Sequence, residues 1–275
     1  MILLDIDGTL TNDQKIITPK TKQALKQAQA NGCLLVLASG RPVSGLVRYY
    51  EELDMHHHHG LLVAYNGSKV VDCQTQEVYF NQPMSIQASQ AVLKHLKAFD
   101  VIPMIDKGRY MHVENVFNGF IMLKGKPFNI IEYEARAGQF LLCEEEDLVS
   151  FADFEINKIL TAATPSYLNE HAEAMSAPFK DTLSCMFTAP HYFEYTAKGI
   201  DKAKTIDAVV QKLGYTREDC IAFGDAPNDL SMLRYASLGI AMANADEACK
   251  QAADEVTLSN NEDGIAYSLE KHGLI

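Results

Sequence analysis

The apolar positions of the chain fall into short continuous runs that alternate with amphipathic stretches. Residues 1–4 (MILL) and 33–38 (CLLVLA) have the length and composition of strands that are buried on both faces. Between them lies a helical pattern, in which Thr18 can cap the helix and Pro19 fits its first position. This succession of strand, helix and strand predicts a parallel sheet covered by helices.

The next segments extend the same pattern. Residues 42–54 are expected to form a helix that begins at a proline. The apolar residues 61–65 are expected to pair with 69–72 as a hairpin, joined by a two-residue turn at Asn66-Gly67. This hairpin would add two strands to the sheet.

Residues 83–189 do not follow the regular alternation of strand and helix, because helical patterns mix there with several short strand patterns. We expect an inserted α+β domain of roughly 105 residues, which is a common domain size. The regular alternation returns after residue 198 and ends in a helix from about Asp263. The chain is therefore predicted to be α/β, with a core domain formed by residues 1–82 and 190–275 and a second domain inserted at 83–189.

Composition argues against several classes of partner. Asp and Glu number 36 against 24 Lys and Arg, and the formal net charge is −12, so nucleic acid and anionic membranes are not expected to bind. No apolar stretch approaches the roughly 20 residues that cross a bilayer, and the first residues lack a basic signal-peptide start. The six cysteines are scattered, as is typical of reduced thiols in a cytosolic protein. We expect a cytoplasmic monomer or homodimer.

Four polar clusters stand at or near the points where apolar strands are expected to end. They are Asp5 with Asp7, Ser39-Gly40-Arg41, Lys202, and Asp225 with Asn228-Asp229. The carboxyl ends of neighbouring parallel strands line one crevice, so clusters far apart in sequence can meet there. Two carboxylates after a buried strand repel each other unless a cation lies near them. Each cluster alone is common, but the four together predict one site.

These clusters resemble the motifs of haloacid dehalogenase superfamily phosphatases of the Cof type, which carry a type IIB cap. The four motifs are matched by residues 5–9 (DxDGT), Ser39, Lys202 and residues 224–229 (GDxxND). The segments at 65–67 and 259–266 also resemble this branch. Residues 241–245 (AMANA) depart from it at the third position, where relatives usually have glycine. The resemblance implies a Rossmann-like core with a parallel sheet, and it identifies the insert as the cap.

The resemblance also implies a magnesium-dependent phosphatase of small phosphorylated metabolites, with sugar phosphates as the expected substrates. Asp5 would form an aspartyl-phosphate, while Asp7 would serve as general acid and then as general base. The expected metal site comprises Asp5, Asp7 through its carbonyl, Asp225 and, through a bound water, Asp229. Lys202 would add positive charge, and Ser39 would donate to phosphate oxygens. The other expected substrate or phosphate contacts are Gly8, Thr9, Gly40, Arg41, Asn66 and Asn228.

Some of these residues have a simpler interpretation. Arg41 could clamp the substrate or pair with an acid, and we favour the structural role. The run from His56 to His59 is typical of a metal-binding tract, but no second ligand cluster lies nearby in sequence, so a solvated loop is favoured. In the insert, the residues that either face substrate or belong to the core are Met104, Tyr110, His112 and Phe117.

Two other functions remain open from the sequence. A phosphomutase fits because eukaryotic phosphomannomutases share the first motif and a similar cap. A non-catalytic metabolite-binding protein fits the fold, but such a protein would not need all four of Asp5, Asp7, Lys202 and Asp225. Nothing in the insert identifies a substrate.

Overall fold

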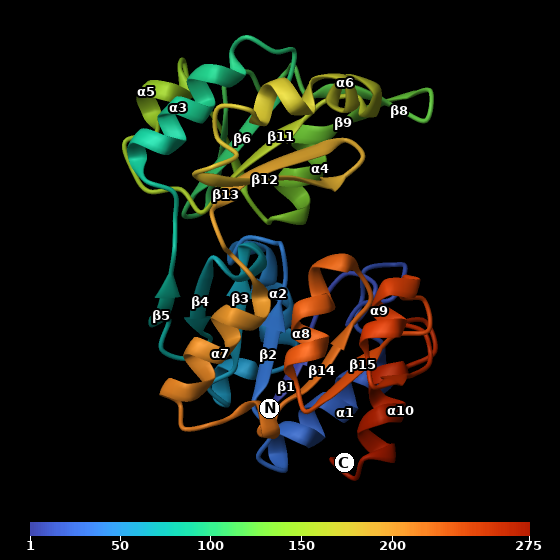
Figure 1. The fold of residues 1–275 in the computed structure, drawn as a ribbon. Coiled ribbons are helices and arrows are strands. Elements are labelled where there is room, and N and C mark those ends of the chain that lie inside the picture. The colour runs from blue at the N-terminus through green and yellow to red at the C-terminus, as the bar shows by residue number, and fades with distance from the viewer. The chain divides into compact units, whose positions relative to one another are not determined.

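The computed structural model describes residues 1–275, which form two compact units. The first unit consists of Met1–Asn81 and Asp201–Ile275, and the second of Gln82–Ile200 (Figure 1). The chain therefore leaves the first unit once and returns to it once.

The first unit is built on an eight-stranded sheet in the order β16-β15-β14-β1-β2-β3-β4-β5. Its strands are β1 (Ile2–Leu4), β2 (Leu35–Ala38), β3 (Leu61–Ala64), β4 (Lys69–Asp72), β5 (Val78–Asn81), β14 (Ile221–Gly224), β15 (Leu238–Ala241) and β16 (Glu255–Val256). All neighbours from β16 to β3 are parallel, and β4 and β5 extend the sheet as antiparallel strands. The predicted α/β fold with a parallel sheet is confirmed.

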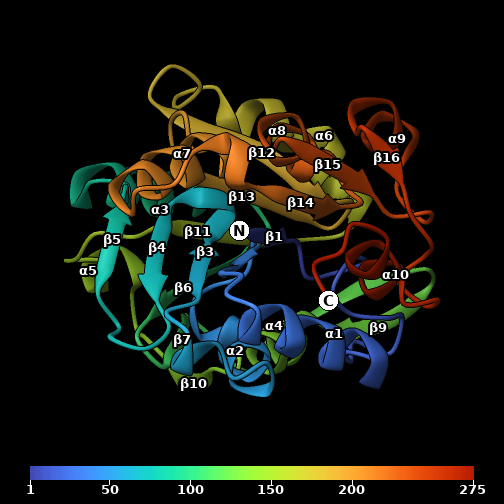
Figure 2. The same ribbon diagram turned by 90° about the horizontal axis from the view of Figure 1, so that it is seen from below.

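Helices cover both faces of this sheet (Figure 2). On one face lie α1 (Pro19–Ala30), α2 (Val47–Glu52) and α10 (Gly264–Lys271), and on the other α7 (Lys202–Lys212), α8 (Leu230–Tyr235) and α9 (Glu247–Ala252). In β1, Ile2 and Leu4 pack into the first layer and Leu3 into the second. Burial on both faces explains why this strand is an unbroken apolar run.

The short 3-10 helices of the first unit are η1 (Ser44–Leu46), η2 (Met55–His57), η3 (Tyr65–Gly67), η4 (Arg217–Asp219) and η5 (Pro227–Asp229). Two expectations differ from the structure at these turns. The helix expected over 42–54 is divided into η1 and α2. The hairpin of β3 and β4 forms, but Ala64 pairs with Lys69, so residues 65–68 connect the strands in place of a two-residue turn.

The second unit has a sheet in the order β10-β7-β6-β11-β13-β12 and a separate two-stranded sheet. The strands are β6 (Ile102–Lys107), β7 (Tyr110–Val113), β8 (Phe120–Leu123), β9 (Lys126–Asn129), β10 (Leu141–Glu144), β11 (Lys158–Ala162), β12 (Leu183–Ala189) and β13 (Tyr192–Ala197). Helices α3 (Ile86–Leu96), α5 (Leu148–Phe151) and α6 (Pro165–Ser176) pack on one face of the larger sheet, and α4 (Ile130–Ala137) packs on the other.

The chain returns to the first unit later than the sequence suggests. Strand β13 pairs with β12 on one side and with β11 on the other, so it is an inner strand of the second sheet. The expected boundary between 189 and 190 falls in the connection from β12 to β13, and the structure divides the units between Ile200 and Asp201. Because β13 is hydrogen-bonded to a strand on each side, it belongs to the second unit together with β11 and β12.

Two broader features bear on the composition. All six cysteines are free. None of the helices has both the length and the apolar character that a membrane crossing requires.

Candidate active site

Side chains from neighbouring parallel strands converge at the carboxyl edge of the first sheet. Asp5 directly follows β1, Ser39 directly follows β2, and Asp225 directly follows β14. Strands β2, β1 and β14 are adjacent in that order, so their carboxyl ends lie side by side. The topology thereby brings together groups that are far apart in sequence.

Lys202 lies at the centre of this group as the first residue of α7. The side chain of Asp201 caps the helix by accepting from the backbone N–H of Lys204 (3.0 Å). Lys202 Nζ donates to Asp5 Oδ1 (2.8 Å), to Asp229 Oδ1 (2.7 Å) and to the carbonyl oxygen of Ala38 (2.9 Å). All three protons of the ammonium are thus hydrogen-bonded within the protein, as they must be because the residue is only 1% exposed.

The charges of this cluster do not balance. Burial works to lower the pKa of Lys202, but the carboxylates of Asp229 and Asp5 outweigh it and hold the pKa above its usual value. Burial and the neighbouring Asp229 raise the pKa of Asp5 well above its usual range, despite Lys202. Burial likewise raises the pKa of Asp225 to about 6, although Thr9 donates to it. Negative charge is therefore in excess here.

The same carboxylates suit a hard divalent cation. Asp5, Asp225 and Asp229 each offer an oxygen atom, and these atoms lie within 4.8 Å of one another. Both oxygens of Asp229 already have partners, because Oδ1 accepts from Lys202 and Oδ2 accepts from the backbone N–H groups of Asp225 and Ala226 (both 3.1 Å). Asp5 and Asp225 are consequently the more available ligands, and oxygen donors are those that Mg²⁺ prefers.

Gly8 and Thr9 hold Asp225 in place. Gly8 has φ +92°, and a Cβ atom built there would lie 2.4 Å from Asp225 Oδ2, so no other residue fits beside this carboxylate. Thr9 Oγ1 donates to Asp225 Oδ1 (2.6 Å). Thr9, expected from the sequence as a phosphate contact, uses its hydroxyl on the candidate metal ligand.

Asp7 lies in a basic environment. Arg41 donates to both of its oxygens, from Nε (2.7 Å) and Nη2 (2.8 Å), and Lys15 Nζ donates to Oδ1 (2.9 Å). Burial opposes the effect, but the hydrogen bonds and charge of Arg41, aided by Lys15, lower the pKa of Asp7 to about 2. Arg41 therefore pairs with an acid, as favoured from the sequence, and that acid is a candidate catalytic residue.

The remaining expected residues lie in the loops at the carboxyl edge of the sheet. Ser39 is buried, and its Oγ accepts from the backbone N–H of Arg41 (3.2 Å). Asn66 has positive φ (56°), and its Oδ1 accepts from Asn228 Nδ2 (3.1 Å). A Cβ atom on Gly40 would come within 3.0 Å of the Asn66 side chain, so the two segments are in close contact.

Sequence reasoning missed two residues that border this site. Lys15 contacts Asp7 from a loop position with φ 60°, and nothing in the local sequence signals that contact. Asn244 donates through Nδ2 to the carbonyl oxygen of Gly8 (2.8 Å) and accepts through Oδ1 from the backbone N–H of Asn260 (2.9 Å). Asn244 lies in the AMANA segment, whose resemblance to the family was the available signal.

The other residues that the sequence singled out lie outside the four polar clusters. Of the four consecutive histidines, His57, His58 and His59 are exposed, in accord with the solvated loop. In the second unit Met104 is buried in the core, whereas Tyr110 is 45% and Phe117 87% exposed. The fourth of the insert residues, His112, is buried.

Comparisons with known proteins agree with this fold. Residues 2–269 match the family described as haloacid dehalogenase-like hydrolase. Among curated proteins, the putative phosphatase YxeH of Bacillus subtilis is 27% identical over 98% of this chain and 97% of its own. The 5-amino-6-(5-phospho-D-ribitylamino)uracil phosphatase YcsE of Bacillus subtilis is 29% identical over 98% of this chain and 94% of its own.

Solved structures show the same likeness. A haloacid dehalogenase-like hydrolase from Bacteroides thetaiotaomicron is 30% identical, covers 98% of each chain and superposes with a TM-score of 0.91. The subclass IIB sugar phosphatase BT4131 is 25% identical, covers 100% of this chain and 99% of its own, and has a TM-score of 0.78. The chain belongs to the haloacid dehalogenase-like hydrolase family. It is an enzyme, a phosphatase of that family.

Proposed function

We propose that this protein is a magnesium-dependent phosphatase that hydrolyses small phosphorylated metabolites, in particular sugar phosphates, through an aspartyl-phosphate. The observation that carries the proposal is the charge of the cluster at the carboxyl edge. Three carboxylates, those of Asp5, Asp225 and Asp229, surround one ammonium group, that of Lys202. The two negative charges left over equal the charge of one divalent cation.

Asp5 is the proposed nucleophile. Its Oδ1 accepts from Lys202, which leaves Oδ2 to attack phosphorus. The bond from Asp5 to phosphorus forms as the bond from phosphorus to the ester oxygen breaks, and the leaving oxygen takes a proton. Water then attacks the aspartyl-phosphate, which releases inorganic phosphate and restores the Asp5 carboxylate.

Asp7 is the proposed general acid and base. With a pKa of about 2 beside Arg41 it is ionised, so it must give up this contact and take a proton before it can donate one. A bound phosphate monoester would bring about both changes. It competes with Asp7 for Arg41, and its own negative charge raises the pKa of Asp7. After the first step the Asp7 carboxylate accepts a proton from the attacking water.

The other residues bind and orient. Asp5, Asp225 and the Asp7 carbonyl would hold Mg²⁺, with Asp229 acting through a bound water. When bound, Mg²⁺ would neutralise the charge of Asp5 and of the phosphoryl oxygens. Ser39 Oγ has its proton free for a phosphate oxygen, since it only accepts from Arg41. Asn228 and Asn66 hold the two loops at 66 and 228 together.

The second unit is the proposed source of substrate discrimination. The charged groups that act on phosphorus all belong to the first unit, so they do not distinguish one leaving group from another. Two relatives support a small phosphorylated substrate, since one is named a sugar phosphatase and another a ribitylaminouracil phosphatase.

The test is phosphate release from a panel of sugar phosphates, nucleotides and phosphorylated cofactors, with Mg²⁺ present. We expect turnover of a subset of sugar phosphates with stoichiometric inorganic phosphate. An isomerised phosphosugar without free phosphate would indicate a phosphomutase. Binding without any turnover across the panel, p-nitrophenyl phosphate included, would indicate a non-catalytic protein and overturn the proposal.

A further inference from the structure

A second cluster of ligating side chains lies within the second unit, at the edge of its larger sheet. Strands β7 and β10 are parallel neighbours, and His112 stands opposite Cys143 in their register. Glu145 follows Cys143 by two residues and continues the ladder, because its N–H donates to the carbonyl oxygen of Val113 (2.9 Å). The period of two in a strand directs the three side chains to the same face.

The three side chains are close enough to share one ion. His112 Nδ1 lies 2.7 Å and Cys143 Sγ 3.5 Å from Glu145 Oε1, and all three ligand atoms lie within 4.8 Å of one another. Ligand atoms around a tetrahedral Zn²⁺ are about 3.3 to 3.8 Å apart, given metal-to-ligand distances of about 2.0 to 2.3 Å. The sulfur-to-oxygen separation already fits. The Glu145 side chain is 22% exposed, so it has room to rotate and lengthen its contact with His112.

His112 is buried, and its Nδ1 edge faces the other two candidate ligands. The residue is 6% exposed, and its ring packs on Phe151 (centroids 4.3 Å apart). Its Nδ1 lies beside the carboxylate of Glu145, which in turn lies beside the thiol of Cys143. The Nε2 atom is buried with no hydrogen-bond partner and would keep none when a metal binds Nδ1, so only the Nδ1 side of the ring favours a metal.

The charge around the cluster favours a cation. Residues 144–147 are four consecutive acids, EEED, of which Asp147 is neutralised by Lys97 (2.5 Å). A nitrogen, a sulfur and an oxygen together are the donor set of late first-row metals rather than of Mg²⁺. The second unit thus combines a nitrogen, sulfur and oxygen ligand set with a local excess of negative charge.

We propose that His112, Cys143 and Glu145 bind one divalent transition-metal cation of the Zn²⁺ type, with water completing its coordination. On binding, the Cys143 thiol loses its proton to solvent and a sulfur-to-metal bond forms, while Glu145 contributes its carboxylate and His112 a neutral ring nitrogen. The ion fastens the edge strand β10 to β7. This site is separate from the carboxylates of the first unit and does not depend on the proposed phosphatase chemistry.

The experiment is a Co²⁺ titration of the full-length protein. The protein is stripped with a chelator, kept reduced with a phosphine, and titrated in excess Mg²⁺, which competes for the oxygen ligands of the first unit. We expect about one equivalent of Co²⁺ to produce a near-ultraviolet thiolate-to-cobalt absorption with tetrahedral visible bands, and Zn²⁺ to abolish both. The thiolate absorption identifies cysteine ligation, which the carboxylates of the first unit cannot imitate.

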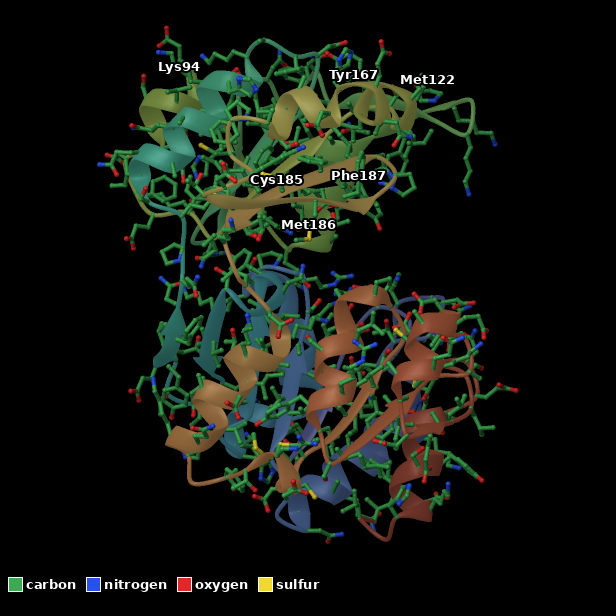
Figure 3. All side chains as sticks on the ribbon, in the orientation of Figure 1. Lys94, Met122, Tyr167, Cys185, Met186 and Phe187 are labelled. Carbon is green, nitrogen blue, oxygen red and sulfur yellow. The ribbon has the colours of Figure 1, made fainter.

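Variants locate the ion. Cys143→Ser should remove the thiolate absorption, and Glu145→Gln should weaken the apparent affinity roughly 10- to 100-fold. The matched control is Cys185→Ser, because Cys185 is also a half-buried free thiol but lies on β12, the opposite edge strand of the same sheet (Figure 3). It should titrate like the wild type. Circular dichroism checks that each variant is folded.

Two results would overturn the proposal. One is the absence of a thiolate absorption at ten equivalents of Co²⁺ in the folded, reduced wild type. The other is an absorption that persists in Cys143→Ser or disappears in Cys185→Ser. Should Cys143→Ser fail to fold, X-ray absorption at the zinc edge of the loaded wild type decides, since the proposal requires one sulfur ligand and a shell of nitrogen and oxygen alone contradicts it.

Discussion

Two buried aspartates, at the carboxyl and amino ends of the parallel strands of the first sheet, have pKa values that are shifted in opposite directions. Asp5 is 5% exposed at the carboxyl end of β1, and Asp72 is 1% exposed at the end of β4, beside the amino end of β3. Burial raises the pKa of Asp5, and Asp229 raises it further. Burial also works to raise the pKa of Asp72, but hydrogen bonds from Thr75, His59 and Gln74 outweigh it and lower that pKa.

The difference separates a structural acid from a functional one. Asp72 accepts from the N–H groups of Gln74 (2.7 Å) and Thr75 (2.8 Å) and pairs with His59 (3.1 Å), so the protein itself satisfies its charge. Asp5 shares the ammonium group of Lys202 with Asp229 and also lies near Asp225, so the chain balances only part of the negative charge of this cluster. A hollow of about 450 Å³ lies at the Asp72 edge, lined in part by His58, His59 and Tyr79. The size of a cavity alone therefore does not identify the catalytic site.

The strongest test replaces each aspartate by its near-isosteric amide. Asp5→Asn should reduce phosphate release by more than about 10⁴-fold, because an amide cannot act as the nucleophile. Asp72→Asn is the matched control, equally buried on the same sheet, and should keep activity within a few-fold. Steady-state phosphate release measures both. Activity of Asp5→Asn within tenfold of the wild type would contradict the nucleophile assignment.

Removing the divalent cation should abolish the phosphatase activity. We expect EDTA to abolish turnover and Mg²⁺ to restore it, because Lys202 alone does not balance the carboxylates. Ca²⁺ should inhibit, since it accepts more ligands and can bind Asp5 through both oxygens, which occupies the attacking atom. Full activity after exhaustive chelation, or equal rates with Ca²⁺, would argue against this geometry.

Asp7→Asn should have the next largest effect. The loss of a general acid and base is worth roughly 10²- to 10⁴-fold, and it should slow both the formation and the hydrolysis of the phosphoenzyme. Rapid-quench detection of the phosphoenzyme measures the two steps separately. If both rates are unchanged, Asp7 has only the structural role of pairing with Arg41 and Lys15.

The smallest expected effect is on stability. Replacing Asp225 and replacing Asp72 by asparagine should change the unfolding temperature in opposite directions. The pKa of Asp225 is about 6 in the folded protein, above its usual value, so at pH 7 without metal its charge destabilises the fold, and Asp225→Asn should raise the unfolding temperature in EDTA. The lowered pKa of Asp72 stabilises the fold above the usual aspartate pKa and is lost as pH falls through the lowered value, so Asp72→Asn should lower that temperature.

Shifts of about 2 to 5 °C are expected, and calorimetry at pH 7 in EDTA measures them. Wild-type protein in the same buffer with Mg²⁺ provides the reference, because a bound cation removes the advantage of Asp225→Asn. Shifts of the same sign in both variants would contradict the distinction between the two edges.

The carboxyl edge could be predicted from the sequence because its geometry follows from topology. Asp5, Ser39 and Asp225 each come directly after an apolar run, and parallel strands place such positions together. The contact of Lys15 with Asp7 could not be predicted, since it depends on a left-handed backbone at Lys15 and on a side-chain rotamer. Local sequence carries no sign of either.

The limits of the insert were harder to predict for a different reason. Strand β13 belongs to the second sheet through pairing with β11, whose residues precede their partners by thirty positions or more, as in the pair of Phe193 with Thr161. Such non-local pairing leaves no mark in the segment itself. The regular alternation in the first unit does leave a pattern in the sequence, because all its α-helices except α7 come next along the chain after a strand of the same sheet.

The position of β1 has a consequence for synthesis on the ribosome. One edge of β1 pairs with β2, but the other pairs with β14, which ends at Gly224. At about 5 to 20 residues per second, the first strand waits on the order of 10 to 40 s for this partner. During that interval the whole second unit emerges and can fold alone around its own cores. Until β14 is made, that edge of β1 is an unpaired strand edge on which a chaperone can act.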